Sequence, residues 1–234
     1  MSGHSKWATT KRKKEAVDAK RSANFTKLAN IITIAARAGG DPETNFKLRM
    51  AIDKAKEYSL PKDNIERAIK RGIGELAGNQ IEEVTYEGFG PEGIAFIIEV
   101  VTDNKNRAVS EVKHLLAKYG GSLSGPNSVM WQFERKGVIV LDKTSLSDEE
   151  ELALIDAGVD DINTEDGITL FTAVENFNKV KEKTESLGLK VLEANLEYVA
   201  KEKIRPKNEE TVTKLYEDLD ACDDVSNFYS NAEV

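Results

Sequence analysis

The chain has 234 residues, of which 32% are charged, and its formal net charge is −8. This length allows two or three domains with a sizeable core, and no stretch approaches the apolar length that a membrane-spanning helix needs. With Cys222 as the single cysteine and His4 and His114 as the two histidines, an intrachain disulfide is excluded and an ordinary zinc site nearly so. We therefore expect a cytoplasmic protein that works without a cofactor.

The charge is divided unevenly along the chain. Residues 1–75 hold 17 Lys and Arg against 9 Asp and Glu, a net charge of +8, whereas residues 76–234 hold 16 against 32, a net charge of −16. Such asymmetry indicates a polyanionic partner for the basic part. The acidic part offers surfaces for protein partners. We expect a monomer with no membrane contact.

The first segment is a basic run that contains an aromatic residue. Lysine and arginine neutralise phosphates, and a tryptophan among them can stack on a base or sugar. The alternative is a solvated arm whose Trp7 folds back onto the first helix. The predicted nucleic-acid contacts here are His4, Lys6, Trp7, Lys11, Arg12, Lys13, Lys14, Lys20 and Arg21.

Three short helices follow, over residues 22–38, 45–58 and 61–72, because apolar residues recur there at helical spacing. Short links between them predict an antiparallel bundle, and residues 73–80 are expected to form a linker. The outer side of the third helix is basic and is a second candidate nucleic-acid surface. Its residues are Lys62, Arg67, Lys70 and Arg71. The alternative is an ordinary helix surface in which these cations form salt bridges with Asp63 and Glu66 and bind nothing.

The apolar run 94–102 predicts a strand buried on both faces, and the helix after it ends at Gly120-Gly121. Polar residues lie where the strand passes into the helix: Asp103, Asn104, Asn106 and Arg107. Helix N-termini often hold ligands, so phosphate or a hard cation is a candidate there. The alternative is a network of helix caps, since Asp and Asn are common capping residues.

Catalytic patterns are weak in this sequence. Glu87, Glu99 and Asp103 could act as paired carboxylates, but no histidine, serine or cysteine partner accompanies them in sequence. The glycines at 88, 90 and 93 precede a strand, whereas a phosphate-binding loop precedes a helix. We therefore predict a protein that is not an enzyme. The weaker alternative is a metal-dependent phosphoester enzyme at the Asp103 cluster.

After a loop over 122–128, alternation from Val129 predicts a half-buried strand, with Trp131 and Phe133 in the core rather than forming a base-stacking platform. We expect a turn at Arg135-Lys136-Gly137 and another between Asp160-Asp161 and Glu165-Asp166.

The pattern over residues 138–200 predicts a second domain. Apolar runs and apolar residues at helical spacing predict the order strand, helix, strand, helix, strand, which suits a ferredoxin-like α+β domain. A final helix at 209–220 and a strand at 223–229 would complete the preceding domain's sheet.

Five motifs, in order, resemble one known family. They are GHSKW at 3–7, LPKDNIERAIKRG at 60–72, YEGFGPEG at 86–93, VTDNKNR at 101–107 and KYGGSL at 118–123. Together they resemble the YebC/PmpR-type proteins over almost the whole chain. The resemblance implies an α+β fold with a three-helix bundle and two α+β domains, the third inserted in the second. The implied boundaries are 1–77, then 78–135 with 205–234, and 136–204.

That family includes DNA-binding transcriptional regulators and ribosome-associated translation factors. The resemblance therefore implies a nucleic-acid-binding regulator of gene expression with DNA as its partner, and ribosomal RNA is the alternative. Two stretches depart from the family pattern. Phe46 follows Asn45 where the family tends to have proline, and Pro126 interrupts a loop at 124–128 that more commonly ends in Gly-Ser.

Overall fold

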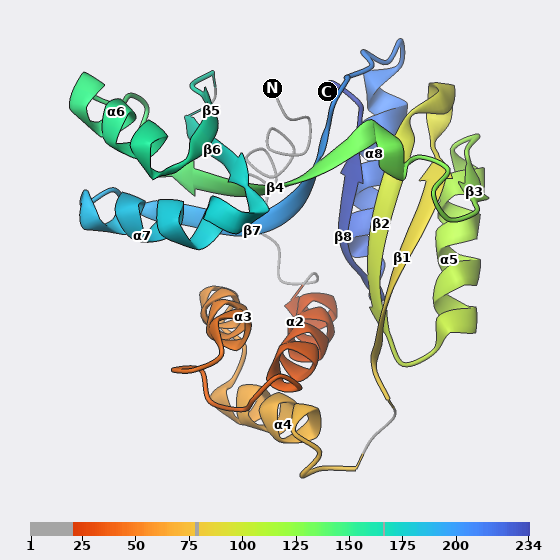
Figure 1. Ribbon diagram of the computed structural model, residues 1–234. Coiled ribbons are helices and arrows are strands. Elements are labelled where there is room, and N and C mark those ends of the chain that lie inside the picture. The colour runs from red at the N-terminus through yellow and green to blue at the C-terminus, as the bar shows by residue number, and fades with distance from the viewer. Residues whose placement is uncertain (1–20, 78–79, 166) are drawn as a thin grey trace. The chain divides into compact units, whose positions relative to one another are not determined.

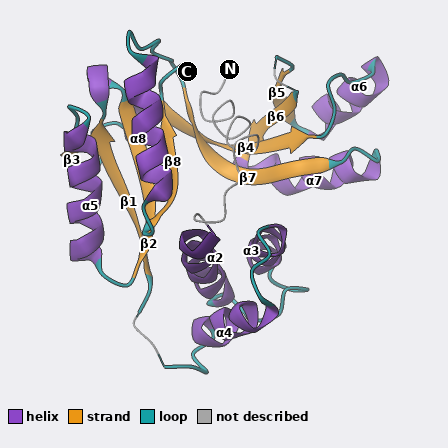
Figure 2. Cartoon of the chain, turned by 180° about the vertical axis from the view of Figure 1, so that it is seen from behind, coloured by secondary structure: helices purple, strands orange, loops and turns teal. Residues whose placement is uncertain are grey.

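The computed structural model describes residues 21–77, 80–165 and 167–234 (Figures 1 and 2). The described chain forms two compact units. Among the described residues, one comprises 21–129 together with 206–228, and the other comprises 130–205 and 229–234. The expectations for residues 1–20 lie outside the described residues. In the parts of the chain that are described, no helix is long and apolar enough to cross a membrane.

The predicted helical bundle is confirmed. Its helices are α2 (Arg21–Ala36), α3 (Phe46–Glu57) and α4 (Lys62–Gly72). The Asn45 side chain accepts a hydrogen bond from the Leu48 N–H and so caps α3. Pro61 immediately precedes α4, where the fixed φ of proline suits the start of a helix. The apolar stripes of all three helices meet in one core that includes Ile32, Leu48 and Ile65.

The first sheet has the strand order β3-β1-β2-β8. Its elements are β1 (Glu82–Phe89), β2 (Ala95–Thr102), α5 (Lys105–Lys118), β3 (Ser122–Ser124), α8 (Glu209–Ala221) and β8 (Val225–Ser230). The central strand β2 is buried along almost its whole length, as its apolar sequence predicts. Tyr216 of α8 packs edge-on against Phe96 of β2 and also contacts Phe228 of β8. The helices α5 and α8 lie on the same side of this sheet (Figure 2).

The second sheet has the antiparallel order β5-β6-β4-β7. Its elements are β4 (Phe133–Leu141), α6 (Asp148–Ala157), β5 (Val159–Asn163), β6 (Ile168–Ala173), α7 (Phe177–Ser186) and β7 (Val191–Ala200). This βαββαβ order fits the ferredoxin-like architecture that the sequence predicts. Ser147 and Glu150 form the expected capping box at the start of α6. The division of the chain into three domains remains a prediction.

The structure corrects several local predictions. Trp131 lies in a single 3-10 turn, Met130–Gln132, and its side chain is 68% exposed, so only Phe133 of the predicted pair is in the core. Residues 135–137 continue β4 rather than form a turn, because Lys136 and Gly137 pair with both β6 and β7. Glycine is required at 137 because a side chain there would collide with Phe177 of α7. Asp160 and Asp161 lie in β5, a strand that the sequence pattern does not predict. The start of the expected loop at 122–128 pairs with β1 as the short strand β3.

Candidate nucleic-acid interface and the Arg107 cluster

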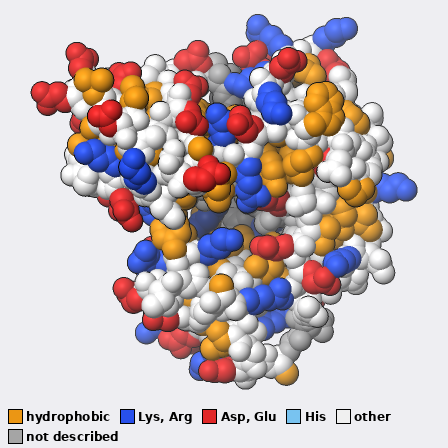
Figure 3. All heavy atoms as spheres, in the orientation of Figure 1, with side chains coloured by type: hydrophobic (Ala, Val, Ile, Leu, Met, Phe, Trp, Pro, Cys, Tyr) orange, Lys and Arg blue, Asp and Glu red, His pale blue; other side chains and the backbone are white. Residues whose placement is uncertain are grey.

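Only part of the predicted nucleic-acid surface falls within the described residues. Residues His4 to Lys20 of the predicted set lie outside them, and Arg21 begins α2 without a described side chain. The four cations of α4 can therefore be examined directly. The face of the bundle seen in Figure 3 carries Lys and Arg side chains interspersed with Asp and Glu.

Helix α4 separates apolar from basic residues. Ile65 and Ala68 are buried in the bundle core, and Lys62, Arg67 and Lys70 are exposed. Lys62 forms only a long contact with Glu66, 3.7 Å between Nζ and Oε1, with both side chains largely exposed, and such a pair contributes little to stability. The Arg67 and Lys70 side chains form no ion pair with any residue in the described ranges. Their charges are therefore available to a polyanion.

The Asp103 cluster lies between the end of β2 and the start of α5. The Asn104 side chain accepts a hydrogen bond from the Arg107 N–H at 3.1 Å and caps α5, and the Asn104 N–H donates to Thr102 Oγ1 at 3.0 Å. These two bonds confirm the predicted helix cap. Asn106 is exposed, and its carbonyl accepts from the Ser110 hydroxyl at 2.8 Å.

Arg107 is engaged by two carboxylates. Its Nε and Nη2 donate to the two oxygens of Asp224 at 2.9 and 2.8 Å, and Nη2 also donates to Asp103 Oδ1 at 3.1 Å. The Asp224 side chain is only 5% exposed, whereas that of Arg107 is 47% exposed. Hydrogen bonding to Asp224, followed by smaller effects that include Asp103, raises the pKa of Arg107 above its usual value. Arg107 therefore fastens the start of α5 to the segment between α8 and β8 as a two-pronged ion pair.

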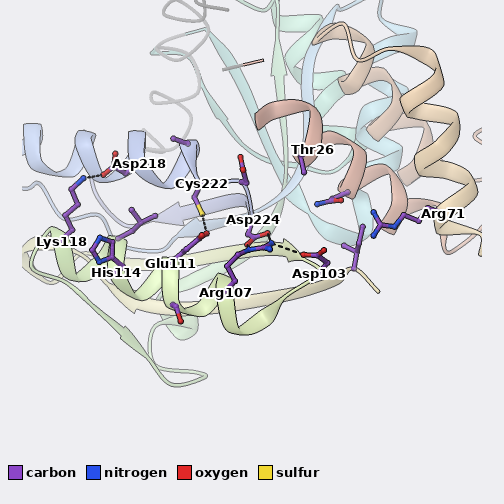
Figure 4. A pocket seen from close by; sticks show the side chains of 16 residues that line it. Thr26, Arg71, Asp103, Arg107, Glu111, His114, Lys118, Asp218, Cys222 and Asp224 are labelled. Atoms are coloured by element: carbon purple, nitrogen blue, oxygen red, sulfur yellow. Dashed lines mark hydrogen bonds and ion pairs between the residues drawn. The ribbon is translucent and has the colours of Figure 1, made fainter. Parts of the chain in front are cut away.

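A groove of about 1010 Å³ runs between α5 and the end of α8 (Figure 4). Residues of both helices line it, with Thr26 and Arg71 of the bundle at one end. Its lining includes Glu111, His114, Lys118, Asp218 and Cys222.

Several polar groups along this groove pair with one another. Lys118 Nζ and the Tyr119 hydroxyl both donate to Asp218 Oδ2 at 2.7 Å, and these hydrogen bonds lower the pKa of Asp218. The Cys222 thiol donates to Glu111 Oε2 at 3.4 Å, and burial raises the pKa of that thiol. The described residues contain no group of three His, Cys, Asp or Glu side chains arranged to hold a metal ion.

This geometry bears on the two interpretations of the Asp103 cluster. The capping network is present, and Asp224, which supplies the strongest contact to Arg107, was not among the predicted site residues. No local signal identifies it, because it lies 117 positions further along the chain from Arg107. A ligand role for Asp103, Asn104, Asn106 and Arg107 stays a prediction.

Comparison with known proteins gives matches over nearly the whole chain. Residues 5–75 match the family described as the TACO1/YebC protein N-terminal domain, and residues 81–232 match the TACO1/YebC second and third domain. A probable transcriptional regulatory protein of Thermoanaerobacter pseudethanolicus is 49% identical over 100% of this chain and 98% of its own length. One from Thermotoga petrophila is 50% identical over 100% of this chain and 94% of its own.

Among solved structures, a conserved hypothetical protein from Aquifex aeolicus aligns with a TM-score of 0.80 at 40% identity. The alignment covers 92% of this chain and 91% of the other. The similarity therefore extends through the bundle and both sheets.

Proposed function

The chain belongs to the TACO1/YebC family, and from this premise we propose that it is a nucleic-acid-binding regulator of gene expression that binds DNA to control transcription. Relatives with about half of their residues identical carry the name probable transcriptional regulatory protein. The observation that carries the proposal is the basic outer face of α4, with Arg67 and Lys70 exposed and unpaired among the described residues. The strongly basic segment that precedes the bundle in sequence supplies further phosphate contacts.

The proposal assigns no catalytic step to the protein. Asp103 and Asp224 direct carboxylate oxygens at Arg107, so these groups are used in holding α5. Asp218 is likewise engaged by Lys118 and Tyr119. These pairings support a scaffold stabilised by ion pairs rather than an acid–base site.

The test is the salt dependence of binding to duplex DNA. Replacing Arg67 and Lys70 with alanine removes two exposed cations from α4. We expect weaker binding and a log–log salt slope that is shallower by about 0.9 for each phosphate that these side chains no longer neutralise. A Lys11/Arg12/Lys13/Lys14→Ala variant should flatten the slope further.

The matched control is Lys47→Ala/Lys54→Ala on α3, which removes the same charge from another exposed part of the bundle. If the α4 and α3 variants bind alike, α4 is not the contact surface. If the unmodified protein shows no salt-sensitive binding to DNA or RNA, the proposed function is wrong.

Ribosomal RNA is the second candidate ligand, because lysine and arginine neutralise either phosphate backbone and no groove-reading motif is present in the sequence. Co-purification separates the candidates. The protein is isolated under mild salt with DNase, with RNase or with neither, and the bound nucleic acid is sequenced. Material that is removed by RNase and sediments with ribosomal subunits would favour a translation factor over a transcriptional regulator.

A further inference from the structure

Trp131 is the most exposed large apolar side chain among the described residues, at 68%. Its neighbours along the chain are buried, with Val129 at 0% and Phe133 at 5%. The 3-10 turn Met130–Gln132 breaks the alternation between these two and directs the indole outward. The indole therefore presents an aromatic face at the surface, where a flat ligand can reach it.

The surroundings of Trp131 are basic and aromatic. Lys201 Nζ donates to the Trp131 carbonyl at 2.9 Å, and the Lys201 N–H donates to the Gln132 carbonyl at 2.9 Å. One step further along the sheet, Arg135 pairs with Tyr198 in the β4–β7 register. The Arg135 guanidinium lies 5.0 Å from the centre of the Tyr198 ring and donates to its hydroxyl at 2.9 Å. The strands β4 and β7 that carry these residues lie side by side (Figure 1).

Trp131, Arg135, Tyr198 and Lys201 together are named the Trp131 platform. Residues 130–136 and 198–205 hold five Lys and Arg against two Asp and Glu, within a part of the chain whose net charge is −16. Within the described residues, neither Arg135 nor Lys201 forms an ion pair. Lys136 is paired, with Glu134 at 3.6 Å and with Asp160 at 3.8 Å, so the cations that the platform itself offers are Arg135 and Lys201. The platform is thus a local basic region in an acidic half.

We propose that the Trp131 platform is a second nucleic-acid contact, which stacks an unpaired base on the Trp131 indole. Lys201 and Arg135 meet the phosphates on either side of that base. This inference rests on the proposed function, and it adds a site in the acidic half of the chain. An unpaired base is required, because a base inside a duplex already stacks on its neighbours and cannot offer a face to a side chain. The Tyr198 ring holds the Arg135 fork in place, which favours a planar contact with phosphate oxygens.

Fluorescence tests the stacking directly. The chain has two tryptophans, so Trp7→Phe leaves Trp131 as the only indole emitter. The full-length variant is titrated with an RNA hairpin that has an unpaired loop and with a fully paired duplex of the same length. We expect the hairpin to quench Trp131 emission, because stacking brings the base against the indole, and the duplex to leave it nearly unchanged.

Affinity provides the second measurement. In the otherwise unchanged protein, Trp131→Ala should weaken hairpin binding by about tenfold, the usual effect of removing one stacking side chain, and Lys201→Ala should weaken it less. Each substitution should change the affinity for the duplex less than it changes the affinity for the hairpin. Leu152→Ala is the matched control, because Leu152 is also exposed, at 63%, and lies on α6 of the same unit. Thermal melts confirm that each variant is folded.

The two proposals fail in different ways. Hairpin binding with unquenched Trp131 and an unaffected Trp131→Ala variant would overturn the platform and leave the proposed function standing. A protein partner would then be the next candidate to test, since tryptophan is also enriched at protein interfaces. An absence of binding to hairpin and duplex alike would overturn both proposals.

Discussion

Two adjacent glycines end α5, and they are required for different reasons. Gly120 has a φ of +78°, and a Cβ added to it would meet nothing within 4 Å. Its requirement is therefore conformational, since a left-handed backbone disfavours other residues. A Cβ at Gly121 would lie 2.1 Å from the Phe89 carbonyl oxygen, so its requirement is steric. The second glycine lets the chain pass directly beside β1.

This difference predicts an order of destabilisation. Gly120→Ala should lower the free energy of unfolding by about 1–2 kcal/mol, the cost of placing an L-residue in the left-handed region. Gly121→Ala should cost more, because the backbone of β1 must move. Urea denaturation of both variants measures the two values. Equal effects, or a smaller effect at Gly121, would contradict the assignment of a steric requirement to that position.

At the scale of the elements, the helix boundaries could be predicted because their signals are local. Asn45, Asn104 and the Ser147–Glu150 box each act on an N–H group within three residues of the cap. Turn predictions failed where a distant element decides the outcome. A glycine after Arg135-Lys136 suggests a turn, but Gly137 accommodates Phe177 of α7 within a continuous strand. Sequence pattern alone does not reveal that contact.

In the candidate sites too, features set by local signals could be predicted, whereas features set by distant residues could not. The cap at Asn104 was predicted, whereas the Arg107–Asp224 pair was not, because it joins residues far apart in the sequence. Alternation placed Trp131 in the core, but a single 3-10 turn shifts the side-chain directions and exposes it. Lys62, Arg67 and Lys70 of α4 lie at the surface as predicted, because helical periodicity separates them from Ile65 and Ala68. Arg71 of the same predicted face is half-buried and lines the groove.

The link between α5 and β8 gives a prediction at this scale. Arg107→Gln leaves the buried Asp224 carboxylate without its charged partner, and we expect a decrease of about 1–2 kcal/mol in the free energy of unfolding, less than for a fully buried pair because solvent reaches the half-exposed Arg107. The double variant Arg107→Gln/Asp224→Asn should recover part of that stability, because the remaining amides are neutral. Denaturant unfolding of these two variants and of Asp224→Asn measures the coupling energy between the two side chains. A single variant as stable as the unmodified protein would show that the pair is not structurally important and would reopen a ligand role for Arg107.

At the scale of the whole molecule, charge is separated along the chain, so that one part attracts a polyanion and the other repels it. Residues 1–75 carry +8 and the rest −16. The acidic part repels nucleic acid at long range, and this repulsion weakens as salt shortens the screening length. Like-charge repulsion increases specificity by lowering the affinity for wrong partners. The acidic sheets would then limit non-specific binding by the basic bundle.

A fragment of residues 1–75 tests this division, since helices α2 to α4 share a core of their own. Circular dichroism first establishes that the fragment is helical. We expect it to bind duplex DNA and structured RNA with little sequence preference, and more tightly than the full chain at low salt, because the repelling charge has been removed. The difference between fragment and full chain should shrink as salt rises. Titration of both with specific and scrambled sequences at matched salt measures the effect. If residues 76–234 alone bind as well as the full chain, the bundle is not the principal contact, and the Trp131 platform becomes the leading candidate.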